Sequence, residues 1–284
     1  MRLASYRHKG VESIGIVAGG GIIDLASRTG DVSMQSALAD LERARRHAGD
    51  QPDVAIEDIE WLPPVPRPIH VVGVGLNTRS HFEETAAIRN RTPGDYPKYP
   101  RLFLRSPRSQ VGTGQPLWVP RVSTWLDYEG EIAVVFGSPT RYVDAKEAMT
   151  HVAGLACYND GSVRDYQGHT DQTTAGKSFP HTGGFGPWLT TLDAIPDLED
   201  LTLETRVNGE VRQRMTLADL IFAIPDLIAY VSQIVDIQPG DVLITGSPAG
   251  VGAITRRWLQ AGDVVEVDVS GLGVLTNLVA DEPR

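Results

Sequence analysis

The chain has a single cysteine, Cys157, among its 284 residues, so no intrachain disulfide can form. Cys157 lies in the apolar segment 154–158, which favours a packed strand position over a catalytic nucleophile. A chain of this length buries a large core without disulfides or a structural metal ion. Any bound metal ion is therefore expected to serve function rather than folding.

Basic residues are also in short supply. The chain has 26 Lys and Arg against 36 Asp and Glu, which gives a formal net charge of -10. Nucleic acids and anionic membranes both need a basic surface, so the charge argues against either partner. An anionic small molecule is still allowed, because a bound dication reverses the local sign of an acidic pocket.

Long apolar runs are missing as well. No run is long enough to span a bilayer, and residues 1–10 lack the apolar centre of a signal peptide. We therefore expect a cytoplasmic location and no membrane partner. The chain also has no cysteine cluster and no paired histidine spacing, which argues against zinc.

Strand-like segments outnumber helical ones and do not alternate as βαβ units, which favours a β-rich α+β fold with a mixed sheet. The segment 61–68 holds four prolines and fits neither a helix nor a central strand. We place a domain boundary there. We expect a small N-terminal α+β module over residues 1–66 and a main domain over residues 67–284.

Local patterns predict the individual elements. The sequence Asn208-Gly209 is a strong turn signal for a hairpin over residues 201–211, and Pro225 is expected to open a helix. Apolar alternation or helical spacing predicts the remaining elements. Strands are expected over 11–17, 22–25, 69–74, 101–105, 131–136, 241–245, 264–269 and 273–279, and helices over 36–48, 79–89 and 144–151.

Three carboxylates carry the clearest chemical signal. Glu129 and Glu131 are two residues apart at the start of a strand and therefore share a face. By themselves they fit solvated acids on an exposed edge strand. Asp160 ends another apolar segment, where a strand runs into a loop. Three carboxylates at strand ends suit a hard cation such as Mg²⁺ or Mn²⁺, and Ca²⁺ also fits oxygen ligands.

Three further motifs have both a functional and an ordinary interpretation. His81 and Glu84 have i, i+3 spacing, so the glutamate can orient the imidazole as a base, or both are ordinary polar helix residues. Lys177 presents a cation to an anionic substrate, or it is a surface lysine. The sequence Gly176-Lys177-Ser178 resembles the end of a phosphate-binding P-loop, but Asp171 stands where that motif needs its first glycine, so the match fails. The glycine-rich loop 245–252 binds a carboxylate, or it is a turn.

Taken in order, these motifs resemble the fumarylacetoacetate hydrolase family. The resemblance runs from about residue 69 to the C-terminus. The motifs are Gly75-Leu-Asn77 with His81 and Glu84, Asp127-Tyr-Glu129-Gly-Glu131, Asn159-Asp160 through Arg164 to Gln167, Gly176-Lys177, and Thr245 to Gly252. The resemblance implies a mixed β-sheet or β-roll core in the main domain, which would be the catalytic domain.

The resemblance also implies roles for individual residues. Glu129, Glu131 and Asp160 match the metal ligands. His81 and Glu84 match the pair that activates water, and Lys177 and Gln167 match positions that stabilise an oxyanion or enolate. Thr245 and Ser247 match the loop that contacts the substrate carboxylate, although Ser247 stands where the family commonly has threonine. Arg105 stands where relatives often carry lysine and is expected to clamp a carboxylate.

The implied activity is hydrolysis of a carbon–carbon bond in a small 2,4-dioxo-acid of the acylpyruvate type. His81 would take a proton from water, and the metal ion and Lys177 would hold the leaving carbanion as an enolate. Decarboxylation, isomerisation or dehydration of an oxo-acid by the same chemistry is the alternative. A third hypothesis is that the protein binds a metal ion or a carboxylate without catalysing a reaction. Relatives are commonly homodimers, so we expect a homodimer.

Overall fold

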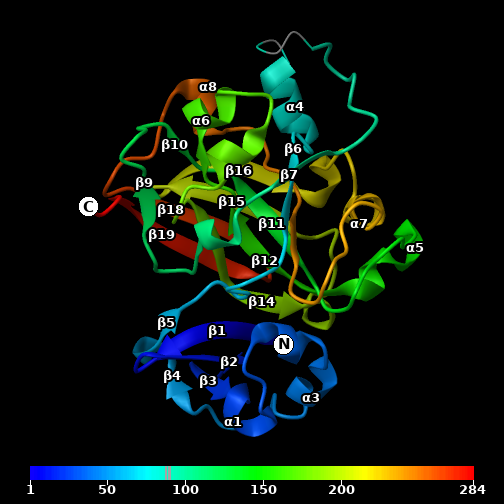
Figure 1. Cartoon of the computed structure of the whole chain (residues 1–284), viewed down its shortest axis with the longest axis vertical. Helices are drawn as coiled ribbons and strands as arrows, with labels where there is room; N and C mark the ends of the chain where they lie inside the picture. Colours follow the sequence, from blue (N-terminus) through cyan, green and yellow to red (C-terminus); the bar gives the residue numbers. More distant parts are fainter. Residues whose placement is uncertain (87, 89–90) are drawn as a thin grey trace.

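The computed structural model describes residues 1–86, 88 and 91–284. The strands of the described chain form three sheets, with short helices around them (Figure 1). The largest sheet has the order β4-β3-β2-β1-β14-β12-β11-β17-β6-β7, with β5 paired to β1 and β8 paired to β14. Parallel pairs, such as β6 with β17, occur among mostly antiparallel ones. The predicted β-rich α+β fold with a mixed sheet is confirmed.

Twelve strands form the large sheet. They are β1 (Arg2–His8), β2 (Val11–Ala18), β3 (Gly21–Asp24), β4 (Val54–Ala55), β5 (Glu60–Trp61), β6 (Val71–Gly75), β7 (Arg101–Leu104), β8 (Gln110–Val111), β11 (Gly130–Phe136), β12 (Val152–Asn159), β14 (Gly183–Thr191) and β17 (Val242–Ile244). A second sheet contains β16 (Glu210–Thr216), β15 (Thr202–Val207), β18 (Val264–Val269), β19 (Gly273–Asp281) and β9 (Leu117–Val119). The strands β10 (Leu126–Asp127) and β13 (Ser162–Val163) pair separately.

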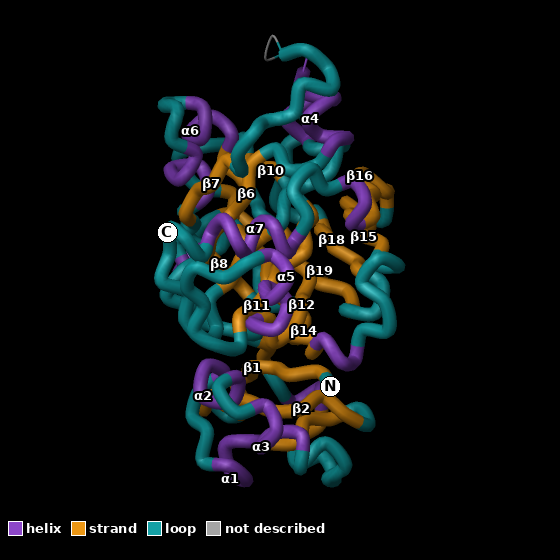
Figure 2. Tube along the Cα trace, turned by 90° about the vertical axis from the view of Figure 1, so that its right-hand side faces the viewer, coloured by secondary structure: helices purple, strands orange, loops and turns teal. Residues whose placement is uncertain are grey.

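The described helices are short. They are α1 (Leu25–Thr29), α2 (Met34–Leu38), α3 (Leu41–Arg45), α4 (Arg79–Ala86), α5 (Ala145–Ala148), α6 (Arg164–Gly168), α7 (Ile224–Val231) and α8 (Gly252–Thr255). Single 3₁₀ turns are η1 (Ile56–Asp58), η2 (Pro107–Ser109), η3 (Met149–His151), η4 (Thr173–Lys177), η5 (Leu192–Ala194) and η6 (Leu217–Asp219). Helices α4 and α6 lie at the opposite end of the molecule from α1 and α3 (Figures 1 and 2).

Two local predictions need correction. The helix expected over 36–48 is two helices, α2 and α3, because Asp40 caps α3 by accepting a hydrogen bond from the Arg43 N–H at 3.0 Å. The helix expected over 79–89 ends at Ala86 as α4, and Arg89 lies outside the described residues.

Two turn-based predictions are confirmed. Asn208 and Gly209 both have positive φ, 53° and 77°, and connect β15 to β16 as a two-residue hairpin turn. Pro225 lies in the first turn of α7, where its missing N–H leaves no helical hydrogen bond unmade.

The N-terminal strands join the large sheet directly. Leu3 of β1 is paired with Leu189 of β14, so β1 to β4 extend the same hydrogen-bonded sheet that contains β11 and β12. Figure 1 shows these strands and α1 to α3 gathered at one end of the long axis. The boundary after residue 66 stays a prediction.

The core lies on both faces of the large sheet. Ile132 and Val134 of β11 pack toward the second sheet and α7, whereas Ala133 and Val135 pack with residues of the N-terminal segment. A strand buried on both faces holds its side chains in fixed positions. Cys157 on β12 is fully buried, as predicted. No helix of the described residues is long and apolar enough to cross a membrane.

Candidate active site

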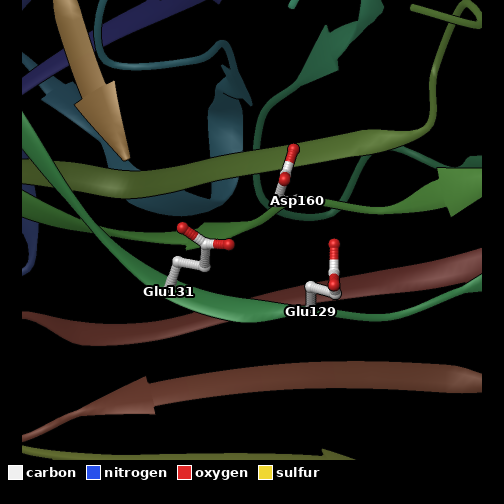
Figure 3. A group of neighbouring side chains, drawn as sticks. All are labelled: Glu129, Glu131 and Asp160. Atoms are coloured by element: carbon white, nitrogen blue, oxygen red, sulfur yellow. The ribbon is translucent and has the colours of Figure 1, made fainter. Parts of the chain in front are cut away.

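The antiparallel pairing of β11 and β12 brings the three predicted carboxylates together. Gly130 is opposite Asn159 in the register, and the Asp160 N–H donates to the Glu129 carbonyl oxygen at 2.8 Å. One ligand oxygen from each of Glu129, Glu131 and Asp160 lies within 4.8 Å of the others. All three side chains are buried, and the two glutamates rise from one strand toward the side of Asp160 (Figure 3).

Two cations, Lys177 and Arg164, contact the carboxylate of Glu129 in this cluster. The Lys177 ammonium group contacts both Glu129 and Asp160, and it also lies 3.3 Å from the Asp160 carbonyl oxygen. Arg164 donates from Nη2 to Glu129 Oε1 at 2.9 Å. Burial by itself would raise the pKa of the Glu129 carboxyl, but the charges of Arg164 and Lys177 outweigh burial and hold that pKa well below its usual range.

Glu131 has no such compensation. Its carboxylate accepts the Gly246 N–H at 2.6 Å, and no Lys or Arg of the described residues forms an ion pair with it. Burial, followed by the charges of Asp160 and Glu129, raises the pKa of the Glu131 carboxyl well above its usual value. A cation bound beside Glu131 would favour the ionised carboxylate and lower this pKa.

The donor set fits a divalent metal ion. All three donors are carboxylate oxygens. Hard cations such as Mg²⁺ and Mn²⁺ prefer oxygen ligands, whereas soft metals prefer sulfur. Glu129, Glu131 and Asp160 together can hold the ion while leaving coordination positions open for substrate oxygens. A Lewis acid at this position would polarise a carbonyl group bound beside it.

The Arg105 guanidinium is bonded to protein groups on all of its nitrogen atoms. Its side chain is fully buried behind Asp160, to which Nη1 donates at 2.7 Å. Nε and Nη2 donate to the Ser109 and Thr182 hydroxyl groups, both at 2.8 Å. All of these acceptors are protein oxygens, so the position of Arg105 does not support the predicted contact with a substrate carboxylate. Its position instead fixes the orientation of the Asp160 carboxylate.

His81 and Glu84 form the hydrogen-bonded pair that their spacing predicts. His81 Nδ1 lies 3.0 Å from Glu84 Oε2, and the other carboxylate oxygen of Glu84 accepts the Gly250 N–H at 2.9 Å. We assign the Nδ1 proton to the bond with Glu84, which leaves Nε2 as the proton acceptor. The loop after β17 thus holds the glutamate that orients the imidazole.

Two connected cavities define the space available to a ligand. The inner cavity, about 50 Å³, is lined by the carboxylate cluster together with His81, Gln167, Lys177 and Ser247. The outer cavity, about 560 Å³, is lined by residues of α4, α6 and α8 together with Trp125 and Trp258. His81 and Gln167 line both, so they lie where the two cavities meet.

One of the two residues predicted to contact substrate from the glycine-rich loop lines a cavity. Ser247 lines the inner cavity, and its hydroxyl oxygen accepts a hydrogen bond from Gln213 at 2.8 Å. Thr245 is fully buried and donates its hydroxyl to the Ile132 carbonyl oxygen at 3.1 Å, so it does not line either cavity. The predicted substrate contact of Thr245 is therefore not supported by its position.

Sequence reasoning assigned no role to three residues that shape the site. Asp127 accepts hydrogen bonds from the N–H groups of Gly252 and Ala253 and from Arg164, so it ties α8 to α6. Arg164 also reaches Glu129, and Arg101 lines both cavities. Asp127 and Arg164 belong to the quoted motifs, which was the available signal, whereas nothing distinguished Arg101.

Comparisons with known proteins agree with this site. The fumarylacetoacetate (FAA) hydrolase C-terminal family matches residues 70–280. The mitochondrial oxaloacetate tautomerase Fahd2a of Rattus norvegicus is 37% identical over 98% of this chain and 91% of its own length. The oxaloacetate tautomerase YisK of Bacillus subtilis is 34% identical, over 79% and 74% of the two chains.

Solved structures agree as well. Maleylpyruvate hydrolase from Sphingobium sp. SYK-6, in complex with manganese(II) and pyruvate, has a TM-score of 0.83 at 26% identity and covers 100% of both chains. A 5-carboxymethyl-2-hydroxymuconate delta-isomerase from Mycobacterium smegmatis has a TM-score of 0.79 at 28% identity, again over 100% of both. With most of its length matched in sequence and in fold, the chain belongs to the fumarylacetoacetate hydrolase family.

Proposed function

We propose that this chain is a Mg²⁺- or Mn²⁺-dependent tautomerase that interconverts the keto and enol forms of a small 2-oxo-acid such as oxaloacetate. One observation carries the proposal: the hydrogen-bonded His81 lines the same small cavity as the carboxylate cluster and Lys177. A proton acceptor, a cation and a metal-binding cluster around one small space are what enolisation requires. The names of the relatives that match nearly the full length support the same reaction.

The chain's own residues supply the proton transfers. A bound dication would contribute Lewis-acid polarisation of the 2-oxo group, which acidifies the neighbouring C–H bond. Nε2 of His81 accepts the proton from C3, and Glu84 stabilises the imidazolium that forms. The Lys177 ammonium group stabilises the negative charge that develops on the 2-oxo oxygen while it keeps its ion pairs with Glu129 and Asp160. His81 then passes the proton from Nε2 to that oxygen, so one C–H bond breaks, one O–H bond forms, and His81 returns to its starting state.

Deuterium exchange tests the proposal directly. With Mg²⁺ present, the protein should accelerate exchange of the C3 protons of oxaloacetate in D₂O, followed by NMR, and decay of the enol ultraviolet absorbance. His81→Ala should reduce both rates by about 10²-fold or more, the usual contribution of a general base, with metal affinity nearly intact.

His47→Ala is the matched control, because His47 is hydrogen-bonded to Asp50 in the N-terminal segment and lies on neither cavity. Its exchange rate should equal that of the unaltered protein. Full activity after EDTA treatment, or exchange no faster than in buffer, would contradict the proposal.

Hydrolysis of a carbon–carbon bond in an acylpyruvate is the second candidate. The outer cavity of about 560 Å³ favours it, because the space can hold an acyl group beyond the 2-oxo-acid. The resemblance to a maleylpyruvate hydrolase supports it too. In this reaction His81 would activate water rather than a C–H bond. Release of pyruvate and a second acid from acylpyruvates identifies the hydrolase, and release of CO₂ from oxaloacetate identifies a decarboxylase.

A further inference from the structure

Three alternate side chains, two on β7 and one on the residue that follows it, lie on one face at increasing depth. Residues 101, 103 and 105 are each two apart along an extended segment, so they share one face. Arg105 is the deepest and is bonded to Asp160. Phe103 lines the inner cavity, with the Lys177 ammonium 5.0 Å from its ring centroid. Arg101 is the outermost and lines both cavities, so its guanidinium borders the passage between them.

Backbone groups hold the Arg101 side chain in place, and no carboxylate pairs with its charge among the described residues. It is opposite Gly75 in the sheet register, and a Cβ at Gly75 would lie 3.8 Å from Cδ of Arg101, so the arginine stem packs over that glycine. Nη2 donates to the backbone carbonyl of Asp171 at 3.3 Å. In the described part of the chain Arg101 forms no ion pair, whereas Arg164 pairs with both Asp127 and Glu129.

The outer cavity has a positive lining in an acidic protein. Arg101, Arg164 and Arg256 line it, and Asp171 alone is acidic among its described lining residues. Arg256, like Arg101, has no ion pair among the residues described. The chain as a whole carries a formal net charge of -10, so this positive lining is a local property of the pocket.

We propose that Arg101 binds a second carboxylate of the substrate and thereby selects dianionic 2-oxo-acids over monoanionic ones. This inference rests on the proposed function, which brings the 2-oxo-acid end into the inner cavity. A carboxylate that extends out of that cavity meets Arg101 at the passage. The planar guanidinium can donate two parallel hydrogen bonds to a carboxylate, which a lysine cannot match.

Two 2-oxo-acids with the same number of carbon atoms, one a dianion and one a monoanion, test the inference. 2-Oxoglutarate and 2-oxopentanoate share the 2-oxo-acid end and differ in the distal carboxylate. Calorimetric titration of the Mg²⁺-loaded protein should give tighter binding of 2-oxoglutarate. Arg101→Gln should weaken that binding about tenfold or more, as expected for loss of a charged hydrogen-bonded pair, and should change 2-oxopentanoate binding less than twofold. Arg101→Lys should recover part of the loss.

Arg46→Gln is the control for a general loss of positive charge, because Arg46 is an exposed residue that lines neither cavity. It should leave both affinities unchanged. Equal weakening of both ligands in Arg101→Gln, or no preference for 2-oxoglutarate in the unaltered protein, would overturn the inference. Selective binding without any tautomerisation of oxaloacetate would overturn the proposed function and leave the role of Arg101 standing.

Discussion

At the scale of single residues, the charges of the site are shared unevenly. Glu129 contacts two cations, Arg164 and Lys177, and Asp160 contacts Arg105 and Lys177. Glu131 contacts none of the described cations and accepts one backbone N–H. A dication bound by the three carboxylates would therefore compensate Glu131 most. Removing any one of the flanking cations would leave a further buried carboxylate without its partner.

Cys157 gives a prediction about reactivity and pH. Burial raises the pKa of its thiol from 9.0 to about 12, and the Sγ atom lies 3.1 Å from the Gly273 carbonyl oxygen. At pH 8 the folded protein should therefore react with thiol reagents at a small fraction of the rate shown by protein unfolded in guanidinium chloride, measured by absorbance of the released chromophore.

The same pKa shift fixes the sign of a stability effect. The unfolded thiol ionises near its ordinary pKa, whereas the folded thiol stays neutral to about pH 12. The contribution of Cys157 to the free energy of unfolding is complete below pH 9 and is lost as the pH rises through that interval. Cys157→Ala should lack this component, and rapid labelling of the folded protein at pH 8 would show that the thiol is accessible.

At the scale of elements, β11 carries the site because both of its faces are packed. Glu129 and Glu131 face the metal cluster, so the residue between them faces the second sheet. A Cβ built on Gly130 would lie 2.0 Å from the Thr205 hydroxyl oxygen of β15, far inside contact distance. Only glycine allows the two sheets to approach this closely at the position where the two metal ligands need support.

Gly130→Ala should therefore destabilise the protein by about 1–3 kcal/mol, the usual cost of overpacking a core. The shift of β11 should also weaken Mg²⁺ binding, because Glu129 and Glu131 move with it. Urea unfolding and calorimetric metal titration measure the two effects.

Thr205→Ala provides the control for this clash. Among the residues that the structure describes, the Thr205 hydroxyl has no hydrogen-bond partner, so its removal by itself should cost little. Combined with Gly130→Ala, it should restore part of the lost stability, since the next contacts of the new Cβ lie at 3.3 Å. Additive losses in the double variant would show that the clash is not the cause.

At the scale of the whole molecule, the N-terminal segment completes the large sheet. Leu3, Ile14 and Ile16 pack in one buried cluster with Leu189 of β14 and Val135 of β11. The predicted homodimer and the cytoplasmic location stay predictions at this scale.

A fragment of residues 67–284 should fold poorly for this reason. It would expose the hydrogen-bonding edge of β14 and the apolar cluster that residues 1–66 cover. We expect aggregation, or a urea transition without the cooperativity of the full chain, followed by circular dichroism.

Leu3→Ala in the full chain tests the same packing with a smaller change than deletion of residues 1–66. Leu3 is fully buried, so truncation should cost about 2–5 kcal/mol while the metal site keeps its affinity. A fragment that unfolds at the same urea concentration as the full chain would contradict the role of the N-terminal segment.

The sequence by itself predicted much of the site and of the fold. The i, i+2 spacing of Glu129 and Glu131, the i, i+3 spacing of His81 and Glu84 and the Asn208-Gly209 turn depend on local backbone geometry, which short-range patterns encode. Membership of the family followed from the order of the motifs. The apolar spacing by itself predicts one continuous helix over 36–48, so it missed the break between α2 and α3. That break depends on Asp40, which caps the start of α3.

Tertiary structure decided which charged groups face the ligand space. Arg105 and Arg101 are equivalent by strand periodicity, yet the first is buried against Asp160 and the second borders both cavities. Depth below the surface depends on what packs over a strand, and no pattern within the strand specifies that. For the same reason Thr245 is buried away from both cavities, whereas Ser247, two residues later, lines the inner cavity. Residue type and spacing therefore determined which groups were available, and packing between distant segments determined which of them line the cavities.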